Sequence, residues 1–353
     1  MDDQIKKTTT IYDVAHEAGV SVATVSRVLN HRDQVTAKTA QKVLTAISKV
    51  DFTPPNIEPR ERNLISKHHF NQKKPSIMSQ NPLLLFCIPS LTNPFYGELV
   101  RGAQTSAYMS GYHLLVHCMP INANSADSLI HLIRDYHIAG VILADAVPEH
   151  VLERLSEITP VIQCSEFSPG MANSYVSIDN YSASRKAMEY ILSTGRQDIA
   201  FFTISAPFYY SRKRLEGYFD ALLNAGIVVN EERIIYVPDI DFSLAFHSMS
   251  RYLQSAPTPE AIFAISDVLA SAAIRAAHKA GLSVPKDLLV VGFDNTDISL
   301  TTTPTITTVS QPRFQLGQRT VETLLEQLRE GRYIRRQIFL DTELIIRESS
   351  TLF

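Results

Sequence analysis

The sequence predicts an α/β protein in which a small all-α head, built on a helix-turn-helix, precedes a body of two α/β lobes. At 353 residues the chain exceeds the usual size of one domain. Residues 8 to about 52 are dense in helix signals and lack long apolar runs. From residue 83 onward, apolar runs of strand length alternate with helical stretches, which is typical of parallel sheets built from crossover units. These runs are residues 83–88, 113–117, 140–144, 160–164, 175–178, 199–203, 261–266 and 288–293.

The composition is that of a soluble globular protein with one basic end. Hydrophobic residues make up 45% of the chain and charged residues 20%, and no apolar run is long enough to span a membrane. The first residues, MDDQIKKTTT, lack the apolar core of a signal peptide, so we expect a cytoplasmic protein. Residues 1–75 hold 12 Lys and Arg against 8 Asp and Glu, while the remainder holds 21 against 28. A basic head on an acidic body is expected where one end meets phosphate.

Metal, cofactor and catalytic signals are absent. The three cysteines, Cys87, Cys118 and Cys164, form no CxxC pair and lie in apolar runs, so we expect buried reduced thiols. His113 and His117 lie in a strand-like run and are better interpreted as packed or surface residues than as metal ligands. The sequence contains no GxSxG, P-loop, GxGxxG or HExxH motif. We therefore expect neither a cofactor nor an enzyme activity.

A linker separates the head from the body. Residues 56–80 include Pro59 and Pro75 and the polar string SKHHFNQKKPS, which favours an extended connection. The predicted domains are therefore a head over residues 1–55 and a body over residues 81–353.

The head begins with two short helices joined by a tight turn. Thr10 is a good N-cap for the first helix, Gly19 ends it, and Val20 is an apolar plug in the turn. Ser21 caps the second helix, and Thr36 caps a third. One face of the first helix carries Ile11, Val14, Ala15 and Ala18, and Val43, Leu44 and Ile47 of the third can close a three-helix core. This geometry places a second helix in the major groove of DNA, although a plain helical hairpin would show the same glycine turn.

The string AxxAGVSxATVSRVLN, residues 15–30, resembles the helix-turn-helix of the LacI/GalR repressor family. The resemblance continues over the body in IPSLTNPFYGELVRG (88–102), VSIDN (176–180), RLEGY (214–218), SDVLA (266–270), VGFDN (291–295), TTVSQP (307–312) and ELIIRESS (343–350). It implies a periplasmic-binding-protein-like body of two Rossmann-like lobes, joined by three crossing strands, with a ligand cleft between them. The lobes would comprise about 81–192 with 311–340, and 193–310 with 341–353. Ligands in such sheets lie beyond the carboxyl ends of the strands.

The resemblance also assigns DNA contacts. Val22 and Ala23 would face base edges at the start of the recognition helix, where they can only contact thymine methyls or bases sterically. Thr24 and Ser26 would contact phosphate or bases, and Arg27 would lie deeper in the groove. The complete set of expected DNA-binding residues is Thr10, Ser21, Val22, Ala23, Thr24, Ser26, Arg27, Asn30, Arg60 and Arg62.

Four residues match the family's ligand-binding positions most directly. Phe95 and Tyr96 would form an aromatic wall of the cleft, although an aromatic pair is more often part of a core. Arg214 and Asp294 would grip the hydroxyls of a sugar or ribose from two sides, and they could also form an interlobe ion pair. Further expected contacts, of second rank, are Ser266, Asp179 and Ser90, and Asp267 is expected to cap a helix.

The stretch SAPFYYSRKR, residues 205–214, departs from the family pattern. Phe208 and Tyr210 stand where sugar- and purine-sensing relatives have small polar or basic groups, and Ile240 and Phe242 add apolar surface. An aromatic pocket around one Arg/Asp pair suits a nucleoside, with its base on the rings and its ribose on the charged pair. The motifs CSEFSP, VSIDN and TTVSQPRFQLG with LDTELIIRES look closest to the nucleoside (cytidine) repressor branch. A sugar or purine effector is the alternative.

The expected partners are operator DNA, a small effector and a second copy of the chain. The family's tetramers depend on a C-terminal leucine-heptad tail, which is not seen after ELIIRESS, so we expect a homodimer. A transport binding protein and a regulator that acts only by protein docking are the other classes considered. The first is disfavoured by the helix-turn-helix, and the second by the retained Arg214 and Asp294.

The segment after the head also departs from the family. Most relatives have a hinge helix there whose leucine wedges into the minor groove, but here Arg62 occupies the wedge position and Pro59 lies inside the helix. A helix starting at Pro59 could offer Leu64 instead. We expect a flexible hinge in which Arg60 and Arg62 supply charge attraction. Tight repression would then need a second DNA-bound protein, such as the catabolite activator used by the nucleoside-repressor branch.

Overall fold

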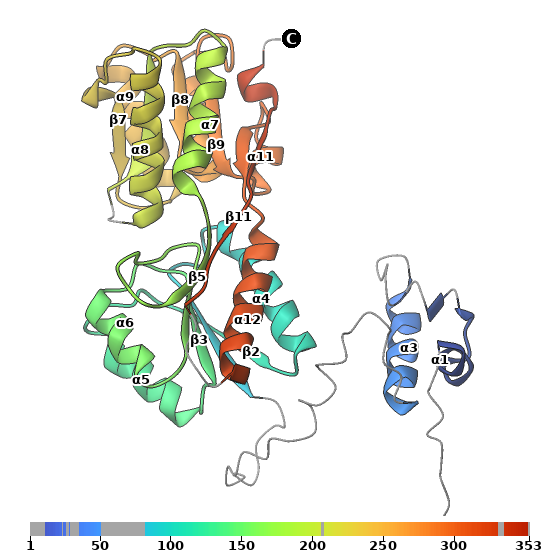
Figure 1. Ribbon diagram of the computed structural model, residues 1–353. Coiled ribbons are helices and arrows are strands. Elements are labelled where there is room, and N and C mark those ends of the chain that lie inside the picture. The colour runs from blue at the N-terminus through green and yellow to red at the C-terminus, as the bar shows by residue number, and fades with distance from the viewer. Residues whose placement is uncertain are drawn as a thin grey trace, which may run out of the picture. The chain divides into compact units, whose positions relative to one another are not determined.

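The computed structural model describes residues 11–22, 24, 25, 28, 35–50, 82–205, 208–330 and 335–351. The chain divides into two compact units, Met1–Met78 and Ser79–Phe353, which correspond to the head and the body (Figure 1). Each unit is described by itself.

The head contains helices α1 (Ile11–Ala18) and α3 (Ala37–Lys49), with helical residues of a second helix between them. Helix α1 ends at Gly19, whose φ of +62° suits glycine. There the N–H of Val20 donates to the carbonyl of Ala15 at 3.1 Å, and the N–H of Gly19 donates to the carbonyl of His16 at 3.2 Å. This pair of bonds is the Schellman ending of a helix, and it directs the chain into the second helix.

Valines and alanines from all three helices form the core of the head. The buried members are Val14, Ala15, Val25, Val28, Ala40, Val43 and Ala46. Val20 packs against this core from the turn, as its apolar character predicts. Thr36 caps α3, where its side chain accepts the N–H of Thr39. The expected cap Thr10 and the side chains of Ile11, Leu44 and Ile47 lie outside the described residues.

The first lobe of the body is a six-stranded parallel sheet covered on both faces by helices. Its strand order is β11-β5-β4-β3-β1-β2. Helices α4 and α12 cover the face that carries Leu84 and Phe86, and α5 and α6 cover the face that carries Leu85 and Cys87. The strands are β1 (Leu83–Ile88), β2 (His113–Cys118), β3 (Gly140–Leu143), β4 (Val161–Cys164), β5 (Ser174–Ile178) and β11 (Gln337–Leu340). The helices are α4 (Phe95–Met109), α5 (Ala126–Asp135), α6 (Glu149–Ser156) and α12 (Arg313–Glu330).

The second lobe repeats this architecture with one antiparallel edge strand. Its order is β12-β10-β9-β8-β6-β7, and β12 runs antiparallel to β10. The strands are β6 (Ile199–Ile204), β7 (Ile234–Val237), β8 (Ala261–Ala264), β9 (Leu289–Asp294), β10 (Thr307–Ser310) and β12 (Glu343–Ile345). The helices are α7 (Asn180–Ser193), α8 (Tyr209–Asn224), α9 (Phe242–Ser255), α10 (Asp267–Lys279) and α11 (Ile298–Thr301), with short 3-10 turns at Glu231–Arg233 and Glu348–Ser350.

The chain crosses between the lobes three times within the described body, after β5, after β10 and after β11 (Figure 1). The first crossing comes before α7, whereas the predicted boundary lies near residue 192. Helix α7 packs on α8 of the second lobe so closely that a Cβ on Gly217 would lie 2.5 Å from the carbonyl oxygen of Tyr181. The predicted boundary is therefore about one helix too late.

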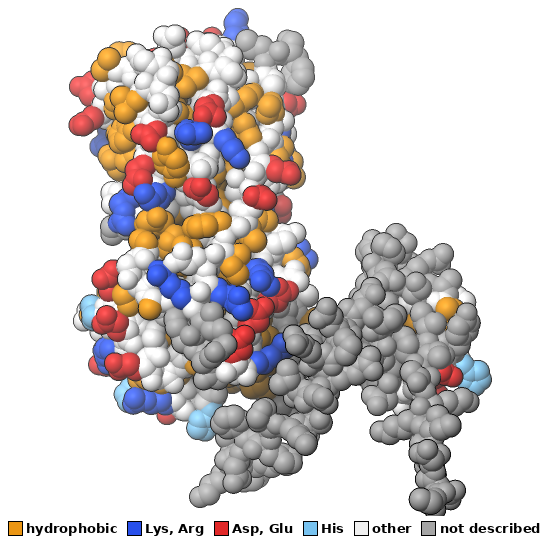
Figure 2. Space-filling model, in the orientation of Figure 1, with side chains coloured by type: hydrophobic (Ala, Val, Ile, Leu, Met, Phe, Trp, Pro, Cys, Tyr) orange, Lys and Arg blue, Asp and Glu red, His pale blue; other side chains and the backbone are white. Residues whose placement is uncertain are grey.

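The surface of the body is mixed in charge. On the face that Figure 2 shows, acidic and basic side chains are interspersed. In the described part of the chain, no helix has the length and apolar character needed to cross a membrane. The described residues also hold no group of three or more His, Cys, Asp or Glu side chains placed for a metal ion. All three cysteines are free, and Cys118 is half-buried, not buried as expected. Burial raises the pKa of Cys87 and Cys164 to about 12, so these two stay protonated thiols.

Candidate functional site

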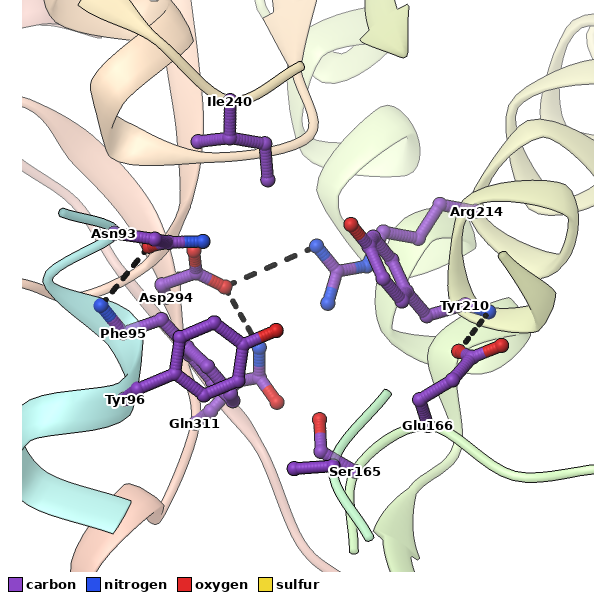
Figure 3. A pocket seen from close by; sticks show the side chains of 11 residues that line it. Asn93, Phe95, Tyr96, Ser165, Glu166, Tyr210, Arg214, Ile240, Asp294 and Gln311 are labelled. Carbon is purple, nitrogen blue, oxygen red and sulfur yellow. Dashed lines mark hydrogen bonds and ion pairs between the residues drawn. The ribbon is translucent and has the colours of Figure 1, made fainter. Parts of the chain in front are cut away.

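A pocket between the two lobes lies beyond the carboxyl ends of their strands, where a doubly wound sheet binds ligands (Figure 3). The space left in it is about 20 Å³, which is room for roughly one water molecule. A larger ligand therefore needs the side chains or the lobes to move apart. The lining residues are Asn93, Phe95, Tyr96, Ala144, Ser165 and Glu166 from the first lobe, Tyr210, Arg214, Ile240 and Asp294 from the second, and Gln311 from a crossing segment.

Arg214, on α8, has a fixed orientation. Its Nε donates to Oδ1 of Asn180 at 2.9 Å, and its Nη1 donates to the carbonyl of Ile265 at 2.6 Å. The guanidinium lies 3.5 Å from the ring centroid of Phe293 and 4.9 Å from that of Tyr210. Only 5% of the side chain is exposed. The guanidinium is thus held by two hydrogen bonds and two rings, with its remaining N–H groups turned toward the pocket (Figure 3).

Asp294, the last residue of β9, faces Arg214. Its Oδ1 lies 3.8 Å from Arg214 Nη1 and accepts a hydrogen bond from Gln311 Nε2 at 2.7 Å. The backbone of Asp294 is in a left-handed region, with a φ of +103°, which is strain of the kind that clusters at ligand sites. Burial raises the pKa of this carboxyl to about 6, although the charge of Arg214 acts in the opposite direction. The carboxylate is therefore costly to bury, and the charges of Arg214 and Arg313 offset part of this cost.

Asp267 supports the turn that follows Asp294. Its Oδ2 accepts the backbone N–H of Thr296 at 2.6 Å and the hydroxyl of Thr296 at 3.1 Å, and its Oδ1 accepts the hydroxyl of Thr308 at 2.6 Å. Asp267 is not the cap of α10, as the sequence suggested. Ser266 is the cap, and its hydroxyl accepts the N–H of Leu269 at 3.2 Å.

Aromatic rings form two walls of the pocket. Phe95 and Tyr96 begin α4, with their rings edge to face at 5.3 Å. Tyr210, in the first turn of α8, forms the opposite wall, and Phe208 stacks behind it at a ring-centroid distance of 5.3 Å without lining the pocket. Burial raises the pKa of Tyr96 and Tyr210, so both phenols stay neutral. Flat apolar groups can pack between such walls.

Glu166 joins the two lobes across the pocket. It follows β4 of the first lobe, and its carboxylate accepts the N–H groups of Tyr209 at 2.6 Å and of Tyr210 at 3.1 Å, at the start of α8. A carboxylate at a helix N-terminus satisfies free N–H groups and interacts well with the helix dipole. Burial still raises the pKa of Glu166 to about 7, although these two hydrogen bonds act in the opposite direction.

Arg313 makes a second link between the lobes. It begins α12, directly after a crossing segment. Its Nη1 donates to the carbonyl of Pro94 in the first lobe at 3.3 Å, and its Nη2 donates to that of Asn295 in the second lobe at 2.9 Å. These two backbone positions adjoin Phe95 and Asp294 of the pocket. Movement of the lobes would therefore disturb the pocket wall and this link together.

The structure brings together six of the eleven residues that the sequence proposed for the effector pocket: Phe95, Tyr96, Tyr210, Arg214, Ile240 and Asp294. The other five do not line it. Ser90 hydrogen-bonds Thr92, Asp179 is an exposed cap of α7, and Ser266 caps α10. Phe208 packs behind Tyr210, and Phe242, 43% exposed, stacks on Phe246 of α9.

Sequence reasoning missed five lining residues: Asn93, Ala144, Ser165, Glu166 and Gln311. Their common signal is position, because each follows shortly after a strand. Ser165 and Glu166 directly follow the predicted run 160–164, and Ala144 is the last residue of the predicted run 140–144, so the rule about carboxyl ends could have found them. Gln311 follows β10, which was not identified as a strand from its sequence.

In the head, Ser21 is exposed and its hydroxyl accepts the N–H of Thr24 at 3.2 Å, as an N-cap does. Thr24 is half-buried, and Val22 is half-buried against the core of the head. Seven of the proposed DNA contacts lie outside the described residues: Thr10, Ala23, Ser26, Arg27, Asn30, Arg60 and Arg62.

Comparison with known proteins finds relatives over the whole chain. Residues 10–55 match the model of bacterial regulatory proteins of the lacI family, and residues 188–350 match that of the periplasmic binding protein-like domain. The chain is 32% identical over 349 residues to the HTH-type transcriptional regulator DegA of Bacillus subtilis (strain 168), covering 97% of this chain and 98% of DegA. It is 31% identical over 343 residues to the HTH-type transcriptional repressor CytR of Escherichia coli (strain K12), covering 97% of this chain and 96% of CytR.

A solved structure has the same fold along the full length. The lac repressor dimer bound to operator and the anti-inducer ONPF matches with a TM-score of 0.70 at 25% identity, covering 98% of this chain and 100% of that chain. This match confirms the predicted combination of a helix-turn-helix head and a two-lobed body. The chain therefore belongs to the LacI family of bacterial regulatory proteins and is a DNA-binding transcription regulator, not an enzyme.

Proposed function

We propose that this protein is a transcriptional repressor whose operator binding is controlled by a nucleoside held between the lobes. The observation that carries the effector assignment is the position of Arg214 and Asp294 between the aromatic walls of Tyr96 and Tyr210. A base can stack on phenol rings, while ribose hydroxyls donate to a carboxylate and accept from a guanidinium. A sugar lacks a planar aromatic ring, and a free base lacks the hydroxyls.

The charges of the pocket favour a neutral effector. Arg214 is its one cation among the described lining residues, and it faces the carboxyl groups of Asp294 and Glu166. No other described lining residue supplies a positive charge for a phosphate group, which usually requires one or more free cations. We therefore expect a nucleoside and not a nucleotide, with cytidine first and adenosine or uridine next. A sugar- or purine-responsive repressor is the alternative.

Effector binding would act on the links between the lobes. The present pocket has room for about one water molecule, so a nucleoside must widen it. Glu166 and Arg313 hold backbone on both sides of the pocket, and their hydrogen bonds would change as it widens. A ligand shifts such an equilibrium by its difference in affinity for the two arrangements. The relative position of the lobes would in turn set the spacing of two heads in a homodimer.

At the operator, we propose that the homodimer places one recognition helix in each half of a palindromic site, in the cytoplasm. The sequence of the hinge segment, with Pro59 inside the expected helix and Arg62 at the wedge position, favours loosely specified spacing between half-sites. A cooperating DNA-bound activator would then tighten repression. Light scattering should give a mass near two chains, and an operator series with altered half-site spacing should show no sharp optimum.

The test of the effector is calorimetry on the purified full-length protein with nucleosides, nucleotides, free bases and hexoses. We expect cytidine to bind and cytidine monophosphate to bind at least 10-fold more weakly. A thermal-shift assay provides a check, because ligand at 100 times its Kd adds about 2.7 kcal/mol to the free energy of unfolding. Tight binding of a hexose without binding of any nucleoside would refute the assignment.

A further inference from the structure

The loop that joins β9 to β10, residues 295–306, begins in a strained turn. Asp294 and Asn295 have φ values of +103° and +53°, so two successive residues other than glycine are in left-handed regions. Such conformations persist only where the surrounding structure holds them. Because Asp294 lines the pocket, the direction of its carboxylate depends on the groups that hold this turn (Figure 3).

Arg347, in the C-terminal segment, holds the β9–β10 loop at three points. Its Nη2 donates to Oδ1 of Asn295 at 2.8 Å, at the start of the loop. Its Nη1 donates to the hydroxyl of Ser299 at 2.9 Å and to the carbonyl of Ile306 at 2.8 Å, in the middle and at the end of the loop. The planar guanidinium can join three such points in a fixed geometry, which a lysine ammonium cannot do.

The segment that carries Arg347 is itself fixed to the sheet. The backbone N–H of Arg347 donates to the hydroxyl of Thr307 at 2.7 Å. The hydroxyl of Ser349 accepts the N–H of Thr307 at 2.9 Å and donates to the carbonyl of Val290 at 2.6 Å. Val290 belongs to β9 and Thr307 to β10, so the segment is bound to both strands that the loop joins.

Asn295 connects Arg347 to the pocket. Its Nδ2 donates to the hydroxyl of Ser310 at 3.1 Å while its Oδ1 accepts from Arg347, so the side-chain amide is held at both ends. The adjoining Asp294 places its Oδ1 3.8 Å from Arg214 Nη1. Arg347 does not line the pocket, so its effect on this carboxylate passes through Asn295 and the loop.

We infer that Arg347 is a positioning residue for the effector pocket, because it holds Asn295 in the conformation that directs the carboxylate of Asp294 toward Arg214. This inference rests on the proposed binding of an effector and adds a residue outside the pocket on which affinity depends. Groups that bind a ligand keep their geometry only when supporting residues fix them. Loss of the Arg347 guanidinium should therefore weaken the effector without removing any group that lines the pocket.

The first experiment measures backbone hydrogen exchange of the full-length protein without ligand, in peptides that cover residues 294–299. Arg347→Met keeps a long side chain and removes every donor of the guanidinium. The N–H of Asn295 donates to the hydroxyl of Thr308, and the N–H of Thr296 donates to Asp267. Both should exchange about 10-fold faster in Arg347→Met, because the turn opens more often. Equal exchange in wild type and Arg347→Met would refute the inference.

The matched control is Arg233→Met, at the opposite edge of the same sheet. Arg233 directly precedes β7, and its guanidinium also donates to side chains, those of Asp198 and Tyr252, and to a backbone carbonyl, that of Pro257. Its loss should lower the Tm and leave exchange of residues 294–299 unchanged. Equal acceleration in both variants would show a general loss of stability and would overturn the positioning role.

The second experiment is calorimetry with cytidine in a double-mutant cycle. Arg347→Met should bind cytidine about 10-fold more weakly than wild type, which corresponds to roughly one charge-assisted hydrogen bond. Asn295→Gly removes the amide that Arg347 holds and tolerates the positive φ. In this background Arg347→Met should lower the Tm again but cause no further loss of affinity. A lower Tm with an unchanged Kd in Arg347→Met, or equal weakening in both backgrounds, would refute the inference.

The two experiments separate this inference from the proposed function. If no nucleoside binds the wild type, the proposed effector is refuted, and hydrogen exchange alone decides whether Arg347 holds the turn. If Arg347→Met does not fold, Arg347→Lys replaces it in both experiments. This variant keeps the charge but cannot join the three points of the loop, so the same changes are expected.

Discussion

The carboxylate of Glu166 accepts the backbone N–H of Tyr210 at 3.1 Å, although the two residues belong to different lobes. The same carboxylate accepts the N–H of Tyr209, so one side chain of the first lobe completes the start of α8 in the second. Tyr210 also forms a wall of the pocket and lies over Arg214. The pocket wall formed by Tyr210 of the second lobe is therefore positioned by Glu166 of the first lobe.

Glu166→Gln should weaken this link. A glutamine amide has one acceptor oxygen and cannot satisfy both N–H groups, and its own NH2 would face a donor. We expect effector affinity to change by about 10-fold, which corresponds to roughly one charge-assisted hydrogen bond, and the radius of gyration to increase in small-angle scattering. Glu153→Gln, on the exposed face of α6, is the matched control. Equal affinity and equal radius in wild type and Glu166→Gln would show that the link has no role.

Asp267→Asn should flatten the pH dependence of stability. Burial and the nearby charge of Asp294 raise the pKa of Asp267 from 3.8 to about 7, so the folded protein binds this proton more tightly than the unfolded chain. The resulting stability is complete below about pH 4 and is lost as the pH rises through about 7. Calorimetric scans should therefore give a Tm that falls between about pH 5 and pH 8 by several degrees more in wild type than in the variant. Parallel curves of Tm against pH for wild type and Asp267→Asn would contradict this role of the Asp267 carboxyl.

Substitutions of Asp294 should separate binding from folding. Asp294→Ala leaves the buried guanidinium of Arg214 without its carboxylate, and breaking a buried pair lowers the free energy of unfolding by about 3–5 kcal/mol. Asp294→Asn keeps a polar group beside Arg214, and asparagine tolerates positive φ better than alanine. Both variants should lose effector binding in calorimetry, and denaturant melts should show the larger loss for alanine. An alanine variant as stable as wild type would mean that Arg214 is solvated.

Gly102→Ala should destabilise the first lobe. A Cβ at Gly102 would lie 1.9 Å from the carbonyl oxygen of Phe314, where α4 packs against α12, and overpacking typically costs about 1–3 kcal/mol. Gly97, on the same helix, has no atom within 4 Å of its added Cβ. Gly97→Ala should therefore raise stability by about 0.5–1 kcal/mol through helix propensity. Urea denaturation of both variants tests the pair, and equal destabilisation would contradict close packing at Gly102.

The eight apolar runs predicted as strands are strands in the structure. Seven of them are almost wholly buried, and burial on both faces leaves a continuous apolar signal. The eighth, β2, lies exposed at a sheet edge and was identified from its apolar run alone. The strands β7, β10, β11 and β12 were not identified. Strands β7, β11 and β12 lie at sheet edges, where β11 alternates exposed and half-buried residues, and β10 carries buried threonines in place of aliphatic residues. Polar or alternating residues weakened the apolar signal of β10 and β11, whereas the run IIYV of β7 is apolar and could have been identified.

The part of the site that follows from position along the chain could be predicted from the sequence. Arg214 and Asp294 could be named from motifs, and the structure places both in the pocket. Phe242 was proposed from its apolar character, but Asp241 caps α9 there and the ring lies 43% exposed on the helix surface. Glu166 and Gln311 could not be assigned roles, because their partners come from segments more than ten residues away that only the folded lobes bring together.

The central claim is that a nucleoside in the interlobe pocket controls operator binding by the head. The most direct test is a competition gel shift with purified full-length protein and a DNA site selected from a random pool, with and without cytidine. The account predicts that saturating cytidine changes operator affinity at least 10-fold in wild type and not in Asp294→Asn, and that Arg27→Ala abolishes preference for the selected site. Operator affinity unchanged by any nucleoside, or changed equally in Asp294→Asn, would contradict it.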